Sequence, residues 1–231
     1  MEHSFSLPVL QSAYIIGHST ETALVKVQSD ILMNMDEQKV TLLVLIDLSA
    51  AFDTVDHAIL LDIMNKVFGI SDTSLQSVES YLQFRSKKIT IKNTNSKEFN
   101  LDYGVPQGSC LGPVMFTQYS SLVFDIISRH NKQGHGYADD HQIYQAVAPN
   151  LLDTARVSME SCLDEIRKWM LSMKLKMNDA KTEYILFGTH QQLAKCTNSD
   201  ITIGDSTIAA SDCVRNLGAY LDKNMTMEQH I

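Results

Sequence analysis

Cysteine, proline and long apolar runs are scarce in this 231-residue chain, and each scarcity excludes a class of protein. The four cysteines are far apart and form no C-x-x-C pair, which predicts reduced thiols in an intracellular protein rather than a disulfide framework. The longest unbroken apolar run, residues 42–46, is far shorter than the ~20 residues that span a bilayer. The first ten residues lack the basic and apolar regions of a signal peptide. We therefore expect a soluble protein that is neither secreted nor membrane-spanning.

Positive charge is also in short supply. The chain has 19 Lys and Arg residues against 27 Asp and Glu residues, which gives a formal net charge of −8. A protein that neutralises phosphates normally carries a basic face, so any affinity for nucleic acid should be weak. The hydrophobic content of 44% is enough for a sizeable core, and no low-complexity stretch divides the chain. One globular unit is the expected organisation.

Hydrophobic periodicity and turn residues predict alternating helices and strands. Helical spacing is present at residues 19–35, 56–67, 72–84, 111–130 and 151–173. Strand patterns are present at residues 40–46 and 182–187, in a hairpin with strands 88–91 and 98–101 around a turn at 93–96, in two short strands around 139–140, in a hairpin at 204–205 and in a final strand near 217. This order predicts an α+β fold built on a split βαβ (ferredoxin-like) antiparallel sheet with helices on one face.

Three aspartates stand where strands are predicted to end. Asp47 follows the apolar strand at 40–46, and Asp139 and Asp140 are adjacent. Neighbouring carboxylates repel each other, and a bound cation would relieve that repulsion. Mg²⁺ takes hard oxygen ligands such as carboxylates, and phosphoryl transfer commonly uses two divalent ions. Taken alone, Asp47 could equally be a helix cap, and the pair could be an ordinary hairpin turn.

Six short segments around these aspartates form a set. Residues 137–140 read YADD, a Y-x-D-D motif, residues 45–57 read LIDLSAAFDTVDH, and residues 104–113 read GVPQGSCLGP. Farther out, residues 17–25 read GHSTETALV, residues 175–187 read LKMNDAKTEYILF, and residues 216–218 read NLG. Taken in chain order, these six segments resemble the motifs of the reverse transcriptase domain of non-LTR (LINE-like) retrotransposons. The resemblance covers nearly the whole chain. The expected sheet would then be the palm of such an enzyme.

The resemblance implies catalytic roles for individual residues. Asp47, Asp139 and Asp140 would be the carboxylates that bind two Mg²⁺ ions, with Mn²⁺ as an alternative metal. Phe52 would be a steric gate that excludes a ribose 2′-hydroxyl. Lys181 would lie near the departing pyrophosphate, where it would stabilise charge or donate a proton.

The resemblance also implies substrate contacts and partners. The expected partners are an RNA template, a DNA primer and dNTPs, and the expected location is nuclear or cytoplasmic. Gln107 would approach the nucleotide or template, and Gly108 would let the backbone come close to the substrate. The full set of expected contacts comprises Pro106, Gln107, Gly108 and Tyr137 for the substrate, and Leu217 and Gly218 for the primer grip.

Simpler interpretations exist for several of these residues. Phe52 alone is more typical of a core aromatic, and Lys181 alone of a solvated charge. Tyr137 can serve in packing, and residues 106–109 have the composition of a turn followed by a helix cap. A basic cluster at residues 85–88 can contact phosphates, but such charges on a hairpin more often form a solvated edge.

The chain also departs from the family pattern. Ile15 and Ile16 stand where the family usually has an arginine, Gly136 replaces a larger apolar residue, and His141 replaces a threonine. We interpret residues 1–39 as partial fingers and 40–231 as mainly palm, with a fingers-like hairpin near 85–102, a primer-grip turn near 216–222 and no thumb. The prediction is an RNA-directed DNA polymerase; the alternative is an inactive retrotransposon-derived fragment that at most binds nucleic acid or protein.

Overall fold

A four-stranded antiparallel sheet organises the computed structural model, which describes residues 10–49, 51–106, 108–197, 200–204 and 206–228. Strand β1 (Val40–Ile46) pairs on one side with β8 (Asp140–Val147) and on the other with β10 (Glu183–Phe187). Strand β7 (Gln133–Tyr137) pairs with the outer edge of β8. In chain order the four strands are arranged 4-1-3-2, which is the predicted split βαβ topology.

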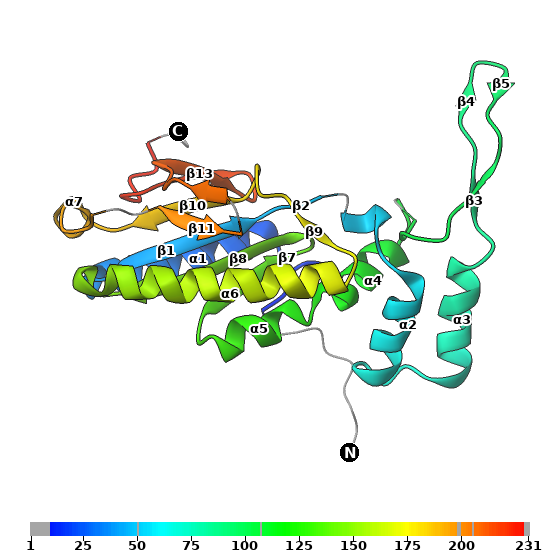
Figure 1. The fold of residues 1–231 in the computed structure, drawn as a ribbon, viewed down its shortest axis with the longest axis horizontal. Coiled ribbons are helices and arrows are strands. Elements are labelled where there is room, and N and C mark those ends of the chain that lie inside the picture. Colours follow the sequence, from blue (N-terminus) through cyan, green and yellow to red (C-terminus); the bar gives the residue numbers. More distant parts are fainter. Residues whose placement is uncertain (1–9, 50, 107, 198–199, 205, 229–231) are drawn as a thin grey trace.

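The other elements surround this sheet (Figure 1). The helices are α1 (Thr20–Asp36), α2 (His57–Lys66), α3 (Asp72–Leu82), α4 (Leu111–Ser120), α5 (Val123–Arg129), α6 (Leu152–Ser172) and α7 (His190–Leu193), with single turns η1 (Ala51–Asp53) and η2 (Pro149–Leu151). The short strands form pairs: β2 (Leu48–Ser49) with β9 (Lys176–Met177), β3 (Ser86–Lys87) with β6 (Phe99–Asn100), β4 (Thr90–Ile91) with β5 (Thr94–Asn95), β11 (Ile201–Ile203) with β12 (Ser206–Ile208), and β13 (Cys213–Asn216) with β14 (Ala219–Asp222).

Both faces of β1 are buried, because successive side chains of a strand point to opposite faces. Leu42 and Val44 belong to the larger apolar cluster, which includes side chains of α4, α5 and α6. Leu43 belongs to a second cluster with Val27 of α1 and Val214 of β13. Helices α4 to α6 therefore cover one face of the sheet as predicted, while α1 and the β13–β14 hairpin cover the other.

Helix α6 follows the predicted helical stripe to within one residue at each end. Its buried residues include Ala155, Met159, Cys162, Ile166 and Met170, which recur every three or four positions. The opposite side of the helix is polar and carries charged pairs such as Lys168 with Asp164. Figure 1 shows α6 lying along the sheet.

A long hairpin projects from the body beyond α3 (Figure 1). The predicted hairpin is confirmed, but its turn lies at residues 92–93, earlier than the predicted 93–96, because Ile91 pairs directly with Thr94. Lys92 takes a left-handed backbone with φ of 54°, as a tight two-residue turn requires. All residues of β3 to β6 are exposed, so pattern alone could not place the turn.

One further expectation was wrong in detail. The helix predicted over residues 111–130 is divided into α4 and α5, and Ser121 at the break donates its hydroxyl to the Gln118 carbonyl at 2.7 Å. The strand predicted near residue 217 is present as part of the β13–β14 hairpin, in which Leu217 and Gly218 form the turn, with φ of 46° and 91°. The hairpin predicted at 204–205 is present as β11–β12, although residue 205 lies outside the described residues.

No helix in the described part of the chain combines the length and the apolar character needed to cross a bilayer.

Truncation of a buried residue of α6 should destabilise the whole sheet. Ile166 is fully buried, so Ile166→Ala should lower the free energy of unfolding by ~2–5 kcal/mol through lost burial and a residual cavity. Val157→Ala is the matched control on the same helix, because Val157 is 60% exposed and should change stability by no more than about 0.5 kcal/mol. Urea unfolding of both variants measures the difference, and equal losses would contradict the assigned core.

Candidate active site

Strand pairing brings Asp47 next to the adjacent aspartates. Asp47 directly follows Ile46, the last residue of β1, and Ile46 pairs with His141 of β8. One step farther along this antiparallel ladder, Asp47 comes level with Asp140, the first residue of β8. The structure therefore collects the three predicted carboxylates at one end of the central strands.

A tight turn presents Asp139. Tyr137 pairs with Asp140, so Ala138 and Asp139 form a two-residue turn between β7 and β8. Ala138 has a φ of 58°, a left-handed conformation that costs a residue with a Cβ ~1–2 kcal/mol. The His141 ring supports the turn, because its Nδ1 donates to the Asp139 carbonyl at 2.9 Å. The turn is thus strained and held by surrounding contacts.

The three carboxylates influence one another electrostatically. Partial burial, followed by the charges of Asp139 and then Asp47, raises the pKa of Asp140 to about 6. Asp140 is exposed by total surface area and lines a cavity of about 200 Å³, but its carboxyl group is partly desolvated, and this desolvation is the largest cause of the raised pKa. Among the described residues, none of the three carboxylates has a Lys, Arg or His partner within 4 Å. The site therefore concentrates negative charge that no described side chain neutralises.

This donor set fits a hard divalent cation, because carboxylate oxygens are the preferred ligands of Mg²⁺. Within the described ranges, however, no three His, Cys, Asp or Glu side chains are close enough to hold an ion together.

The loop at residues 104–112 is attached to the segment after Asp47. The Gly104 and Val105 amides donate to the carbonyls of Val55 and Phe52 at 2.8 and 2.9 Å. Gly104 has a φ of 86°, and a Cβ there would lie 3.0 Å from the Asp53 carbonyl oxygen, so only glycine fits this close approach. These contacts bring the loop with Pro106 beside the turn that contains Phe52.

Phe52 is half-buried rather than free. Its ring stacks on that of Phe116 in α4, with centroids 4.6 Å apart. At the start of α4, the Ser109 hydroxyl donates to the Pro106 carbonyl and accepts from the Gly112 amide, so the predicted turn-and-cap composition is also present. Gly108 has a φ of 79° and open space where a Cβ would be.

Lys181 lies in a turn that contacts the main chain of Asp47. The Asn178 amide donates to the Asp47 carbonyl at 2.9 Å, and the Lys181 amide donates to the Asn178 carbonyl at 3.1 Å. The Lys181 side chain is exposed, and within the described ranges no carboxylate lies within 4 Å of its ammonium group.

The turn at Leu217 and Gly218 lies beside Asp140. Both residues line the cavity of about 200 Å³ that Asp140 also lines. A buried amide pair connects the two parts: Gln142 Nε2 donates to Asn216 Oδ1 at 2.9 Å, and Asn216 Nδ2 donates to Gln142 Oε1 at 3.1 Å. The strand that begins at Asp140 is therefore joined to the β13–β14 hairpin by two reciprocal hydrogen bonds.

The sequence profile described as "Reverse transcriptase (RNA-dependent DNA polymerase)" matches residues 5–221. The chain belongs to the reverse transcriptase family. Its relatives include "RNA-directed DNA polymerase from mobile element jockey" of Drosophila funebris, 25% identical over 98% of this chain and 24% of the relative. Another is "Probable RNA-directed DNA polymerase from transposon BS" of Drosophila melanogaster, 27% identical over 97% of this chain and 25% of the relative. The non-LTR retrotransposon kind of reverse transcriptase predicted from the motifs is thereby confirmed.

The reverse transcriptase domain spans about a quarter of the length of these curated relatives. Solved structures with the same fold include apo telomerase from Candida tropicalis truncated from its C-terminal domain, with a TM-score of 0.61, 14% identity, and coverage of 95% of this chain and 40% of that chain. Telomerase from Candida albicans in complex with a TWJ fragment of telomeric RNA has a TM-score of 0.57, 12% identity, and coverage of 93% and 36%. At these identities the likeness concerns the fold alone.

The reverse transcriptase domain gathers most of the predicted site residues into two neighbouring groups. One contains the three aspartates, with the turn at 217–218 beside Asp140, and the other joins Phe52 to the loop that contains Pro106. Gln107 lies outside the described residues. The individual roles remain predictions.

Sequence reasoning missed the buried amides around the site. Gln142, Asn216 and Gln11 are at most 3% exposed, although glutamine and asparagine are mostly surface residues. Each bonds to a segment distant in the chain, so no local pattern identifies it. Even at Gln142 no local signal was available, because β8 also contains the polar residues Asp140, His141 and Gln145.

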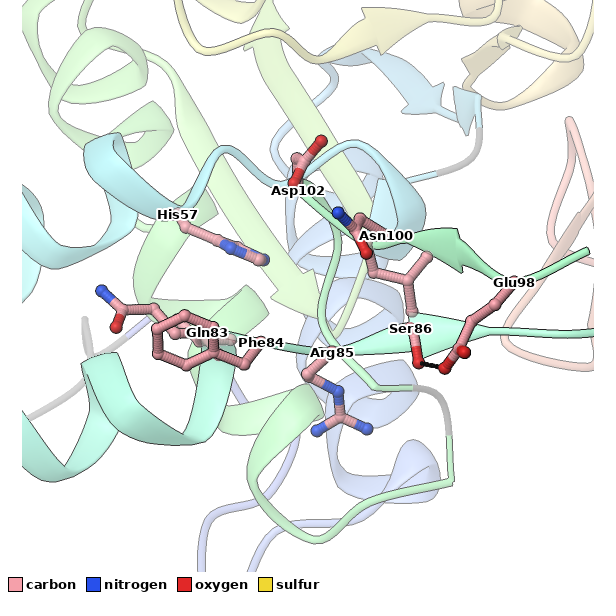
Figure 2. Close-up of a pocket in the computed structure, with 10 residues that line it drawn as sticks. His57, Gln83, Phe84, Arg85, Ser86, Glu98, Asn100 and Asp102 are labelled. Atoms are coloured by element: carbon pink, nitrogen blue, oxygen red, sulfur yellow. Dashed lines mark hydrogen bonds between the residues drawn. The ribbon is translucent and has the colours of Figure 1, made fainter.

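A larger cavity, of about 870 Å³, lies away from the aspartates. Figure 2 shows that its lining comes from His57 at the start of α2, from Gln83 and Phe84 after α3, and from the base of the projecting hairpin. Arg85 and Glu98 are among the hairpin residues. None of the predicted catalytic or metal-binding residues lines this cavity, so size alone does not locate the active site.

The amide pair should contribute cooperatively to stability. Asn216→Leu leaves the Gln142 amide buried without its partner, which should cost ~1–3 kcal/mol. Adding Gln142→Met removes the unpaired group, so the double variant should lose less than the two single variants combined. Urea unfolding of all four proteins gives the coupling energy, and strictly additive losses would show that the pair is not an energetic unit.

Proposed function

We propose that this domain catalyses RNA-directed DNA synthesis, the transfer of a nucleotide from a dNTP to a primer 3′-hydroxyl. The observation that carries the proposal is the convergence of three carboxylates at the ends of β1 and β8, where like charge contributes to the raised pKa of Asp140. Such a cluster of carboxylates is suited to cations, and family membership connects it with polymerisation.

Asp47, Asp139 and Asp140 would hold two Mg²⁺ ions, with Mn²⁺ as an alternative. Two divalent ions supply activation of the attacking hydroxyl and stabilisation of the leaving oxygen in an in-line displacement. The primer oxygen forms a bond to the α-phosphorus while the bond to pyrophosphate breaks. Lys181, whose turn is attached to the Asp47 main chain, would face the pyrophosphate.

The dNTP would lie against Phe52, Pro106, Gln107, Gly108 and Tyr137. Support comes from the hydrogen bonds that join the loop at 104–106 to the segment after Asp47. The open space at Gly108 leaves room for a ligand close to the backbone. The stacking of Phe52 on Phe116 would fix the ring that faces the sugar.

An RNA template and a DNA primer would be the macromolecular partners, in the nucleus or cytoplasm of the cell. The projecting hairpin supports this proposal, because residues 85–97 contain five Lys and Arg residues and no acid despite the net charge of −8. Leu217 and Gly218 would position the primer end, since their turn shares a cavity with Asp140. We assign residues 1–39 to partial fingers and the rest mainly to the palm.

Removal of one carboxylate charge should abolish primer extension. Asp139→Asn keeps the shape of the side chain but removes a metal-binding charge, so extension of a DNA primer on an RNA template with dNTPs and Mg²⁺ should fall by at least ~100-fold. Asp62→Asn, at an exposed ion pair on α2, is the control and should retain activity. A folded wild-type chain that extends no primer, or an Asp139→Asn variant that does, contradicts the proposal.

Shortening the proposed gate should relax sugar selection. In Phe52→Ala, the ratio of ribonucleotide to deoxynucleotide incorporation should rise by about tenfold or more, equivalent to ~1.4 kcal/mol of lost discrimination. The ratio is measured within each variant, so a general loss of activity from the broken Phe116 stack cancels. An unchanged ratio in an active variant would assign Phe52 to packing alone.

A further inference from the structure

The side chain of Gln11 bonds to both backbone groups of Ala138. Gln11 Oε1 accepts from the Ala138 amide at 3.1 Å, and Gln11 Nε2 donates to the Ala138 carbonyl at 3.3 Å. The same Oε1 also accepts from the Ala13 amide at 3.0 Å. Gln11 is 1% exposed, so these bonds are shielded from water. A single buried side chain thus holds the residue that precedes Asp139.

The backbone around Gln11 is fixed to the same strand. The Ser12 amide donates to the Gly136 carbonyl at 2.9 Å, and the Gly136 amide donates to the Leu10 carbonyl at 2.8 Å. Gln11 and Gly136 thereby form a parallel bridge along the outer edge of β7. The register of this bridge therefore fixes the position of the Gln11 side-chain amide along β7, next to the Ala138–Asp139 turn.

Gly136 provides the space for this contact. A Cβ at position 136 would lie 2.7 Å from the Phe124 ring and 3.2 Å from Gln11 Nε2. The glycine that departs from the family pattern therefore admits both the aromatic ring and the glutamine amide. A larger residue would displace one of them.

Ala138, the residue to which Gln11 bonds, also has a strained backbone. Ala138 has a φ of 58°, which L-residues other than glycine avoid. Both of its backbone polar groups are used by Gln11, so the bonds that satisfy these groups also favour the strained conformation. Asp139 is the next residue, and its carboxylate direction depends on this turn.

The geometry points to Gln11 as a positioning residue that holds the Ala138–Asp139 turn and thereby sets the position of Asp139 at the end of β8. Gln11 touches no reacting atom; it acts through the backbone of Ala138. This inference rests on the proposed polymerase function for its catalytic consequence. Its structural part, the support of the turn, is independent of activity.

The test compares two buried glutamines in the full chain. Gln11→Met has a similar volume and loses both hydrogen bonds to Ala138. Gln192→Met is the matched control: Gln192 is also 1% exposed and also joins a backbone amide and a backbone carbonyl, those of Thr189 and Met35, away from the aspartates. Gln11→Met also loses the bond from the Ala13 amide, so a generic loss of buried hydrogen bonds affects both variants to a similar extent, three bonds against two.

The catalytic readout is the Mg²⁺ concentration that gives half-maximal primer extension, together with kcat at saturating dNTP. Gln11→Met should raise the former and lower the latter, each about tenfold, whereas Gln192→Met should leave both near wild type. Adding Ala138→Gly to Gln11→Met should restore part of the loss, because glycine adopts the left-handed turn without support. Equal effects of both Met variants, or no rescue by glycine, would overturn the inference.

Amide hydrogen exchange over residues 136–141 provides a second readout that does not need activity. Exchange in this segment should be about tenfold faster in Gln11→Met than in Gln192→Met. Unchanged exchange would overturn the inference even for an active enzyme. Faster exchange in a chain that extends no primer would support the positioning contact while contradicting the proposed function, so the two failures are distinguishable.

Discussion

The antiparallel pairing of β1 between β8 and β10 is the constraint on which the site depends. The pairing of Ile46 with His141 places Asp47 level with Asp140, and the next segment pairs in turn as β2 with β9. Because side chains alternate along a strand, a shift of one residue would exchange the two buried faces of β1 and move the aspartate away. The apolar clusters on both faces oppose such a shift, so core packing also determines carboxylate placement.

Adjacent carboxylates and backbone strain coexist at the turn that carries Asp139. The fold tolerates them because polar contacts from several elements converge there: the His141 ring bonds to the Asp139 carbonyl, and the Gln142–Asn216 pair joins β8 to the neighbouring hairpin. The Gln142–Asn216 pair is buried and the His141 bond is partly buried, so few water molecules compete for these hydrogen bonds. The surrounding structure thereby maintains the left-handed backbone of Ala138 and the adjacent carboxylates, which would be unfavourable in an isolated hairpin.

The sequence allowed the regular elements to be predicted where periodicity was strong. Strand β1 and helix α6 were located to within one residue because each carries an uninterrupted apolar pattern. The exposed hairpin turn was misplaced and the break before α5 was missed, because neither is marked by a change in the apolar pattern. The aspartates were identified through the order of their motifs. The amides of Gln11 and Gln142 were missed, since their partners are distant in the chain and glutamine carries no positional signature.

The long sequence separation of these amide contacts has a kinetic consequence. Gln11 bonds to Ala138 across 127 residues, and Gln142 bonds to Asn216 across 74. Contacts between such distant positions require closure of large loops, which is slow and occurs late when local helices form first. The turn bearing Asp139 is therefore expected to acquire its final shape only after the segments around Gln11 and Asn216 have docked. During synthesis, the candidate site would reach its final geometry in a single late step.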